Sequence, residues 1–176
     1  NNNRVGGTVA ADRNVISGNA IDGVDISGGT GGTTSTANNL IEGNYIGTDV
    51  TGTLAVANTA QGVAVCNNGA GGANTSNVIG TPGAGNVIAG NNDDGIDIFG
   101  GDSNRVIGNR IGTTAAGTGA RANSDDGIEI RANGANGATH NTGGGTPALE
   151  RNVISANAGS GLHLPNAPPP EMPVRS

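Results

Sequence analysis

The sequence predicts an all-β fold, a parallel β-helix of about five coils with three short strands in each coil. Three observations predict it: aliphatic residues occur in short packets, one motif recurs five times, and a longer segment repeats without a gap. The packets are rich in Ile and Val and lie between Asn, Gly, Ser or Asp, with no apolar stripe at helical spacing. Short β-branched packets between turn-forming residues are typical of strands.

Composition excludes several other classes of protein. The chain has 176 residues, 34 of them Gly, and its net charge is −6. No apolar run approaches the ~18 residues of a membrane span, and the Gly residues have no collagen period of three. Single, scattered basic residues argue against a nucleic-acid surface. We therefore expect one domain with no nucleic-acid partner and no membrane partner.

The recurring motif is Asn, three residues, Gly, an aliphatic residue, any residue, and a second aliphatic residue. Its copies are spaced by 39, 33, 32 and 34 residues. Alternation along a strand predicts that the two aliphatic side chains point inward and the residue between them outward. We expect the motif Asn residues to bond one another in a ladder, and the motif Gly to supply a positive φ. The motif copies begin at Asn19, Asn58, Asn91, Asn123 and Asn157.

A longer period sets the coil boundaries. Residues 39–70 align on 104–135 without a gap, and both segments carry an extra loop, Ile-Gly-Thr-x-x-x-Gly-Thr, at 46–53 and 111–118. We expect a β-helix domain over 1–166 and a Pro-rich tail or linker over 167–176. Open strand edges at the ends of such a stack can pair with other chains, so end-to-end self-association is a further expectation. The predicted coils are 3–38, 39–76, 77–103, 104–140 and 141–166.

The strings NVISGN, NLIEGNYIGTDVTGT and DGVDI resemble the repeats of right-handed parallel β-helix proteins of the bacterial secreted and cell-surface type, which share the pectin-lyase-like superfold. The resemblance covers 1–166. It implies a right-handed helix, as does the crossover rule for parallel strands. It also implies a secreted or cell-surface location. Repeats of this kind occur in adhesins, surface stalks and polysaccharide-active enzymes alike, and we favour a non-catalytic role as a stalk, adhesin segment or ligand-binding scaffold. The partners implied are a polysaccharide or another surface protein.

An acidic cluster is the candidate site. Aligning the copies places six carboxylates on the outward side of the third strands in coils three and four. Like charges at coil spacing repel unless a cation relieves them, and carboxylates are ligands that calcium prefers. The sequence therefore predicts either a calcium site or a solvated acidic ridge here, with Arg121 and Arg131 as candidate neighbours. The six residues are Asp93, Asp94, Asp97, Asp125, Asp126 and Glu129.

A second hypothesis is a polysaccharide-active enzyme, either a glycoside hydrolase or a lyase. Asn-Asp-Asp-Gly at 92–95 and Ser-Asp-Asp-Gly at 124–127 resemble the carboxylate motifs of polygalacturonases, which implies catalytic roles for Asp94, Asp125 and Asp126. The Gly-His-Gly and Arg-x-Lys motifs of that family are absent, and His163 lies three places out of register. We expect His163 to be an ordinary surface histidine. The sequence favours the non-catalytic function.

Overall fold

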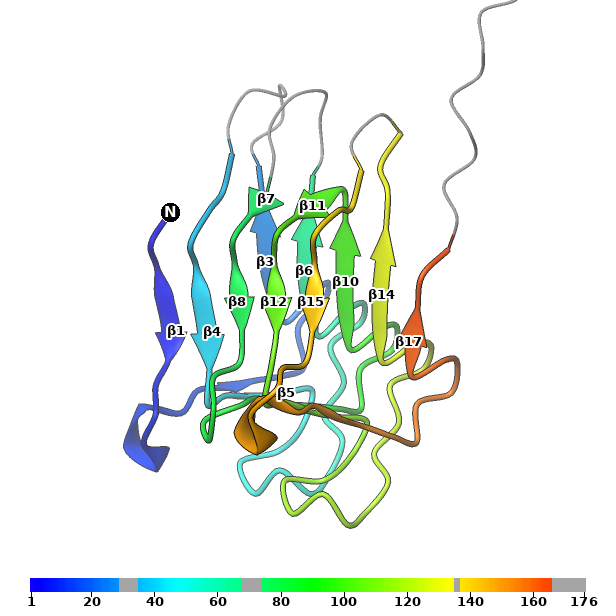
Figure 1. Cartoon of the computed structure of the whole chain (residues 1–176). Helices are drawn as coiled ribbons and strands as arrows, with labels where there is room; N and C mark the ends of the chain where they lie inside the picture. Colours follow the sequence, from blue (N-terminus) through cyan, green and yellow to red (C-terminus); the bar gives the residue numbers. More distant parts are fainter. Residues whose placement is uncertain (29–34, 68–73, 135–136, 166–176) are drawn as a thin grey trace, which may run out of the picture.

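A computed structural model describes residues 1–28, 35–67, 74–134 and 137–165. Over these residues the chain is a parallel β-helix in which each coil contributes one strand to each of three five-stranded parallel sheets (Figure 1). In Figure 1 the sheet that begins with β1 (Arg4–Gly6), sheet A, has strands that point down the page, and the sheet that begins with β3 (Val24–Ser27), sheet C, has strands that point up. The predicted tail, 167–176, lies outside the described residues.

The strand positions confirm the predicted coils, because each coil holds one strand of each sheet in the order A, B, C. Sheet A contains β1 (Arg4–Gly6), β4 (Leu40–Glu42), β8 (Val78–Ile79), β12 (Arg105–Val106) and β15 (Thr142–Gly143). Sheet B contains β2 (Val15–Ile16), β5 (Tyr45–Ile46), β9 (Val87–Ile88), β13 (Arg110–Ile111) and β16 (Val153–Ile154). Sheet C contains β3 (Val24–Ser27), β6 (Val63–Cys66), β10 (Ile96–Phe99), β14 (Ile128–Arg131) and β17 (Leu162–His163).

The remaining elements are small. A two-stranded parallel pair, β7 (Asn74–Thr75) and β11 (Gly101–Asp102), lies between sheets C and A. Two 3-10 turns, η1 (Ala10–Asp12) and η2 (Ala148–Glu150), precede β2 and β16. None of the described helical segments has the length and hydropathy that a membrane crossing requires.

The core is a column of aliphatic side chains enclosed by the three sheets. The strand register places like residues above one another, as in the row of Ile46, Ile88 and Ile111 in sheet B. These three side chains are completely buried. One coil alone cannot cover its aliphatic residues, so the stack of coils is what removes them from water. The buried cluster consists of Ile26, Ile41, Ile46, Val63, Val65, Ile79, Ile88, Ile96, Ile98, Val106, Ile111 and Ile128.

Asparagine ladders occupy all three corners of the helix. The expected ladder before sheet C is present, and equivalent ladders precede sheets A and B. In each, the Nδ2 of one Asn donates to the Oδ1 of the Asn in the next coil at 2.8–3.2 Å. The ladders are Asn3-Asn39-Asn77-Asn104-Asn141, Asn14-Asn44-Asn86-Asn109-Asn152 and Asn19-Asn58-Asn91-Asn123-Asn157.

The motif Gly residues have a different purpose from the one expected. The expectation of a positive φ is wrong, since Gly62 and Gly95 are not among the residues in that region. They are required instead because the coils approach closely. A Cβ on Gly62 would lie 2.7 Å from the carbonyl oxygen of Gly95 and 2.8 Å from Nδ2 of Asn91. Contacts under ~3 Å leave no room for any side chain, so the ladder itself excludes larger residues.

The extra loops of coils two and four lie against each other across coil three. An N–H in the second loop, that of Ala115, donates to the carbonyl oxygen of Gly52 in the first at 2.9 Å. Coil three has no such loop, which leaves space for this contact. An antiparallel bridge closes each loop at its base, Thr48 with Ala55 and Thr113 with Ala120.

Replacing one ladder Asn tests the ladder. We expect Asn91→Ala to lower the free energy of unfolding by about 1–3 kcal/mol, because the Nδ2 of Asn58 and the Oδ1 of Asn123 lose a buried partner. Urea unfolding measures the loss. The neighbouring exposed Asn92 provides the matched control, and Asn92→Ala should be nearly neutral. Equal stability of the two variants would contradict the ladder's role.

A charge placed in the aliphatic column tests the inward assignment. We expect Ile96→Asp to cost roughly 4 kcal/mol or more, because it buries an unpaired carboxylate at a fully covered position. Thermal unfolding by circular dichroism measures the effect. Ile21 is 68% exposed, so Ile21→Asp should leave the melting temperature nearly unchanged. If the two variants melt together, Ile96 does not point inward.

Candidate functional site

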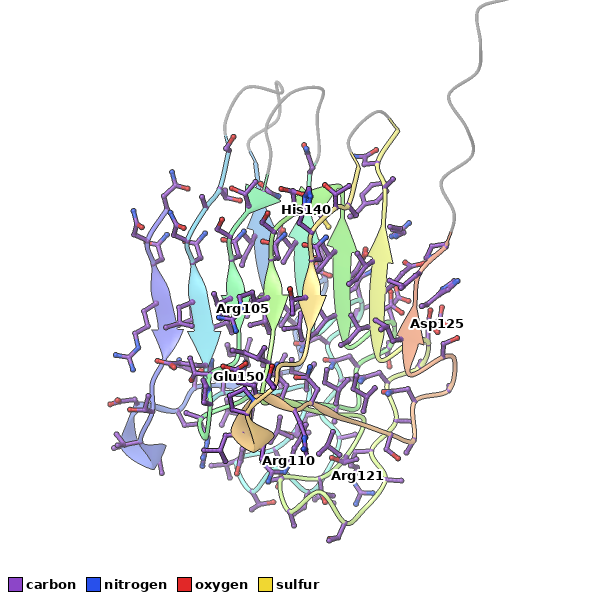
Figure 2. The ribbon with its side chains drawn as sticks, viewed as in Figure 1. Arg105, Arg110, Arg121, Asp125, His140 and Glu150 are labelled. Carbon is purple, nitrogen blue, oxygen red and sulfur yellow. The ribbon has the colours of Figure 1, made fainter. Side chains whose placement is uncertain are left out.

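The outward face of sheet C carries the acidic cluster. Strand pairing places Asp97 of β10 between Ala64 of β6 and Glu129 of β14, and His163 of β17 follows Glu129. Alternation along each strand turns these side chains away from the aliphatic column. Asp125, labelled in Figure 2, lies near β17 at the same end of the molecule. The predicted carboxylates of coils three and four therefore gather on one face.

Two of the carboxylates also hold neighbouring coils together. Oδ1 of Asp94 accepts the backbone N–H of Asp126 at 2.9 Å, and Oδ1 of Asp126 accepts the N–H of Ser160. Asp22 makes the same contact to Gln61 at 3.1 Å in coils one and two. The Asp before the motif Gly thus caps an N–H of the next coil. This structural use explains why Asp recurs at that position.

Arg131 neutralises part of the cluster. Its guanidinium bonds Asp97 at 2.8 Å and Glu129 at 2.6 Å, and it lies over the ring of Phe99 at 4.4 Å. Asp97 is only 2% exposed, so it needs this partner although it points outward. His163 adds a second counter-charge when it is protonated, with Nδ1 at 2.7 Å from Asp126 and 3.5 Å from Glu129.

Three carboxylates have no such partner. One oxygen from each of Asp93, Asp94 and Asp125 lies within 4.8 Å of the other two. Within the described residues, no ion pair reaches any of the three. Asp93 accepts a neutral hydrogen bond from Nε2 of Gln61 at 2.9 Å. These converging oxygens are the part of the cluster with the least internal compensation.

Burial raises the pKa of several carboxyl groups in the acidic cluster. Burial raises the pKa of Asp94 to about 7, with the N–H of Asp126 acting in the opposite direction. Burial also raises the pKa of Asp93, and the neighbouring charge of Asp125 adds to the shift. The pKa of Glu129 is likewise raised by burial, against the attraction of Arg131. The cluster therefore holds its negative charge at a cost, which a cation would reduce.

The six carboxylates predicted from the sequence divide into two groups, with and without a basic partner. Their positions in the sequence do not show this division. Asp93, Asp94 and Asp125 form the unpaired group described above, whereas Asp97, Asp126 and Glu129 have basic partners. Arg131 is a neighbour of the cluster, as expected. Arg121 is not, because its guanidinium bonds the carbonyl oxygens of Thr53 and Ala120 in the extra loops.

The contacts of His163 with the acidic cluster are what sequence reasoning missed. His163 is 45% exposed, as expected of a surface histidine, yet it bonds Asp126 and Glu129. Alignment of the motif copies already places it, two residues after Gly161, in the outward row beside Glu129. That position next to three carboxylates is the signal that could have predicted its contacts.

The geometry allows two kinds of chemistry. Three close oxygens can coordinate a hard cation. An acid–base pair for inverting glycoside hydrolysis needs carboxyl groups ~6.5–9.5 Å apart to admit a water molecule. Oxygens of Asp94 and Asp125 lie within 4.8 Å of each other, near enough to share one cation. No protein-family model, curated protein or solved structure matches the chain.

The raised pKa of Asp94 predicts a pH-dependent stability. The folded protein keeps a proton on Asp94 up to about pH 7, whereas the unfolded chain releases it near the ordinary value of 3.8. The contribution of Asp94 to the free energy of unfolding is therefore complete below pH 3.8 and is lost as the pH rises toward 7. With a chelator present, we expect Asp94→Asn to raise the melting temperature at about pH 8 by at least ~3 °C and to have little effect near pH 4.5.

Asn can still accept the N–H of Asp126, so this variant keeps the structural contact. Asp25→Asn, an exposed change in coil one, is the control and should show no gain at either pH. Parallel pH profiles for Asp94→Asn and the wild-type protein would contradict the protonation of Asp94.

Proposed function

We propose that this protein is a non-catalytic β-helix scaffold, a stalk, adhesin segment or ligand-binding module, that binds calcium on the outward face of sheet C. The observation that carries the proposal is the convergence of three carboxylates, from Asp93, Asp94 and Asp125, without a basic partner in the described chain. A divalent cation would supply the missing counter-charge. It would also link coil three to coil four.

Calcium fits this donor set better than a softer metal. The donors are carboxylate oxygens alone, and calcium accepts six to eight oxygen ligands in flexible geometry. Water or backbone carbonyls would supply the remaining ligands. The other carboxylates, Asp97, Asp126 and Glu129, surround this group and add negative potential, although Arg131 and His163 offset part of it.

The resemblance to bacterial secreted and cell-surface β-helix repeats supports a location outside the cell. The same resemblance supports a relationship to pectin-lyase-like proteins. Calcium concentrations are high outside the cell, so even a site of weak affinity on this scaffold would hold calcium there. The partners proposed are a polysaccharide or another surface protein. The described charge pattern is compatible with this use, because an acidic face keeps a stacked solenoid soluble.

Calcium should stabilise the folded chain. A ligand that binds only the folded state adds RT ln(1 + [L]/Kd), or ~2.7 kcal/mol at a hundredfold excess over Kd. We expect millimolar calcium to raise the melting temperature by several degrees over a chelator control. The double variant Asp93→Asn/Asp125→Asn should abolish this rise, whereas Asp25→Asn should preserve it. A shift that persists in the double variant, or no shift in the wild-type protein, would overturn the calcium site.

A polysaccharide-active enzyme is the second candidate. One observation favours it: the pKa of Asp94 near 7 suits a general acid at neutral pH. The purified wild-type protein can be incubated with polygalacturonate and assayed for new reducing ends, which a hydrolase forms, or for unsaturated products, which a lyase forms. Product that disappears with Asp94→Asn would replace the scaffold proposal.

A further inference from the structure

A groove crosses the corner between sheets A and B, away from the acidic cluster. It arises because the coils differ in length at this corner. In coil two a single residue, Gly43, separates the sheet A strand from the ladder Asn, whereas in coil one 7–13 intervene and form η1. Coil five repeats the long form with η2. Coil three also has a longer segment here, 80–85, so long and short turns alternate at this corner. A groove of about 560 Å³, lined by residues of all five coils, lies between η1 and η2.

Small residues line the middle of the groove. Coil three contributes Gly83, Ala84 and Gly85, and coil four has the tight turn at Gly108, where a Cβ would lie 2.7 Å from the carbonyl oxygen of Thr81. A Cβ on Gly83 would meet no atom within 4 Å, so this position faces open space. The groove is therefore open at Gly83, in its middle coil.

The walls combine exposed apolar side chains with arginines. Val9 on the η1 side is 57% exposed and Leu149 in η2 is 64% exposed, and both line the groove. Exposed apolar groups rimmed by polar residues mark ligand-binding grooves and interaction sites. Arg13, Arg110 and Arg151 also line the groove, in coils one, four and five.

The three groove arginines lack acidic partners. No ion pair reaches any of them within the described residues, and no acidic side chain lines the groove. Glu150, on η2, is directed to Arg105 at 3.5 Å, and both are labelled together in Figure 2. The side chain of Asp12, on η1, packs against the backbone of Gly7, which precedes η1 in the same coil. In a chain of net charge −6, this corner is locally basic.

The chemistry of the walls selects the ligand. Guanidinium groups bind carboxylates in a planar, bidentate manner, and apolar walls favour a ligand with apolar groups between its charges. A sugar would need an open aromatic face, yet Tyr45 is the aromatic residue of the groove and Arg13 covers its ring at 4.1 Å. A peptide with alternating acidic and apolar side chains satisfies both kinds of wall.

We propose that this groove binds an extended acidic peptide segment of a partner protein. Five coils at ~4.8 Å spacing span ~19 Å, and an extended peptide rises ~3.3 Å per residue, so about six residues fill the groove. Carboxylates of the peptide bond Arg13, Arg110 and Arg151, and its apolar side chains contact Val9 and Leu149. Arg110 and Asp125 are well separated in Figure 2, so this site is distinct from the calcium site.

Fluorescence anisotropy tests the proposal, with a fluorescein-labelled hexapeptide of sequence Glu-Leu-Glu-Ala-Glu-Leu titrated with the whole chain in the presence of a chelator. We expect binding at least ~tenfold tighter than that of the Gln-Leu-Gln-Ala-Gln-Leu peptide, and weaker at high salt. Arg110→Gln and Arg151→Gln should each weaken binding ~fivefold or more, and Arg110→Lys should weaken it less. Arg121→Gln removes an arginine outside the groove and should have no effect.

Several outcomes would overturn the proposal. These are equal affinity for the Glu and Gln peptides, no binding at millimolar protein, equal losses for Arg110→Gln and Arg121→Gln, or displacement of the peptide by an acidic oligosaccharide at lower concentration than by unlabelled peptide. Thermal unfolding of each variant confirms that it is folded. The chelator removes calcium, so failure here does not bear on the calcium site.

Discussion

The coil-to-coil amide bonds of asparagine set the geometry on which the other features of this protein depend. Each corner of the helix turns the backbone away from a sheet and leaves polar groups facing the interior. A ladder Asn satisfies them by accepting an N–H and an amide from the previous coil and donating to the next, as Asn44 does between Asn14 and Asn86. Buried polar groups without partners are costly, so the corners tolerate little else.

The same spacing builds the acidic face. Because Asp94 and Asp126 cap N–H groups one coil apart, any carboxylates beside them repeat at the same interval and converge. The repeat thereby concentrates negative charge that an isolated strand would not tolerate. Arg131 offsets the part over sheet C, where His163 also bonds Asp126, and the remaining group around Asp93 and Asp125 stays without a basic partner in the described chain.

Differences between coils, in contrast, create the two surface features that the repeat alone would not. Coils two and four lengthen the corner before sheet C, where their loops meet through Ala115 and Gly52. Coils one, three and five lengthen the corner before sheet B, where η1 and η2 bound the groove. The corner before sheet C thus supports packing between coils, and the corner before sheet B offers a surface for a ligand.

The sequence by itself determined the fold class, the coil boundaries, the strands, one of the three ladders and the six carboxylates, because a repeat read along the chain specifies which residues stack in register. Only the tertiary structure decided that Arg131 pairs with Asp97 while Arg121 turns to Thr53, and that a groove joins Arg13 to Arg151. Long side chains choose partners in neighbouring coils, some 30 to 40 residues away along the chain, by direction as well as by position. Register predicts position, but the direction of a flexible side chain depends on the charges and the space around it.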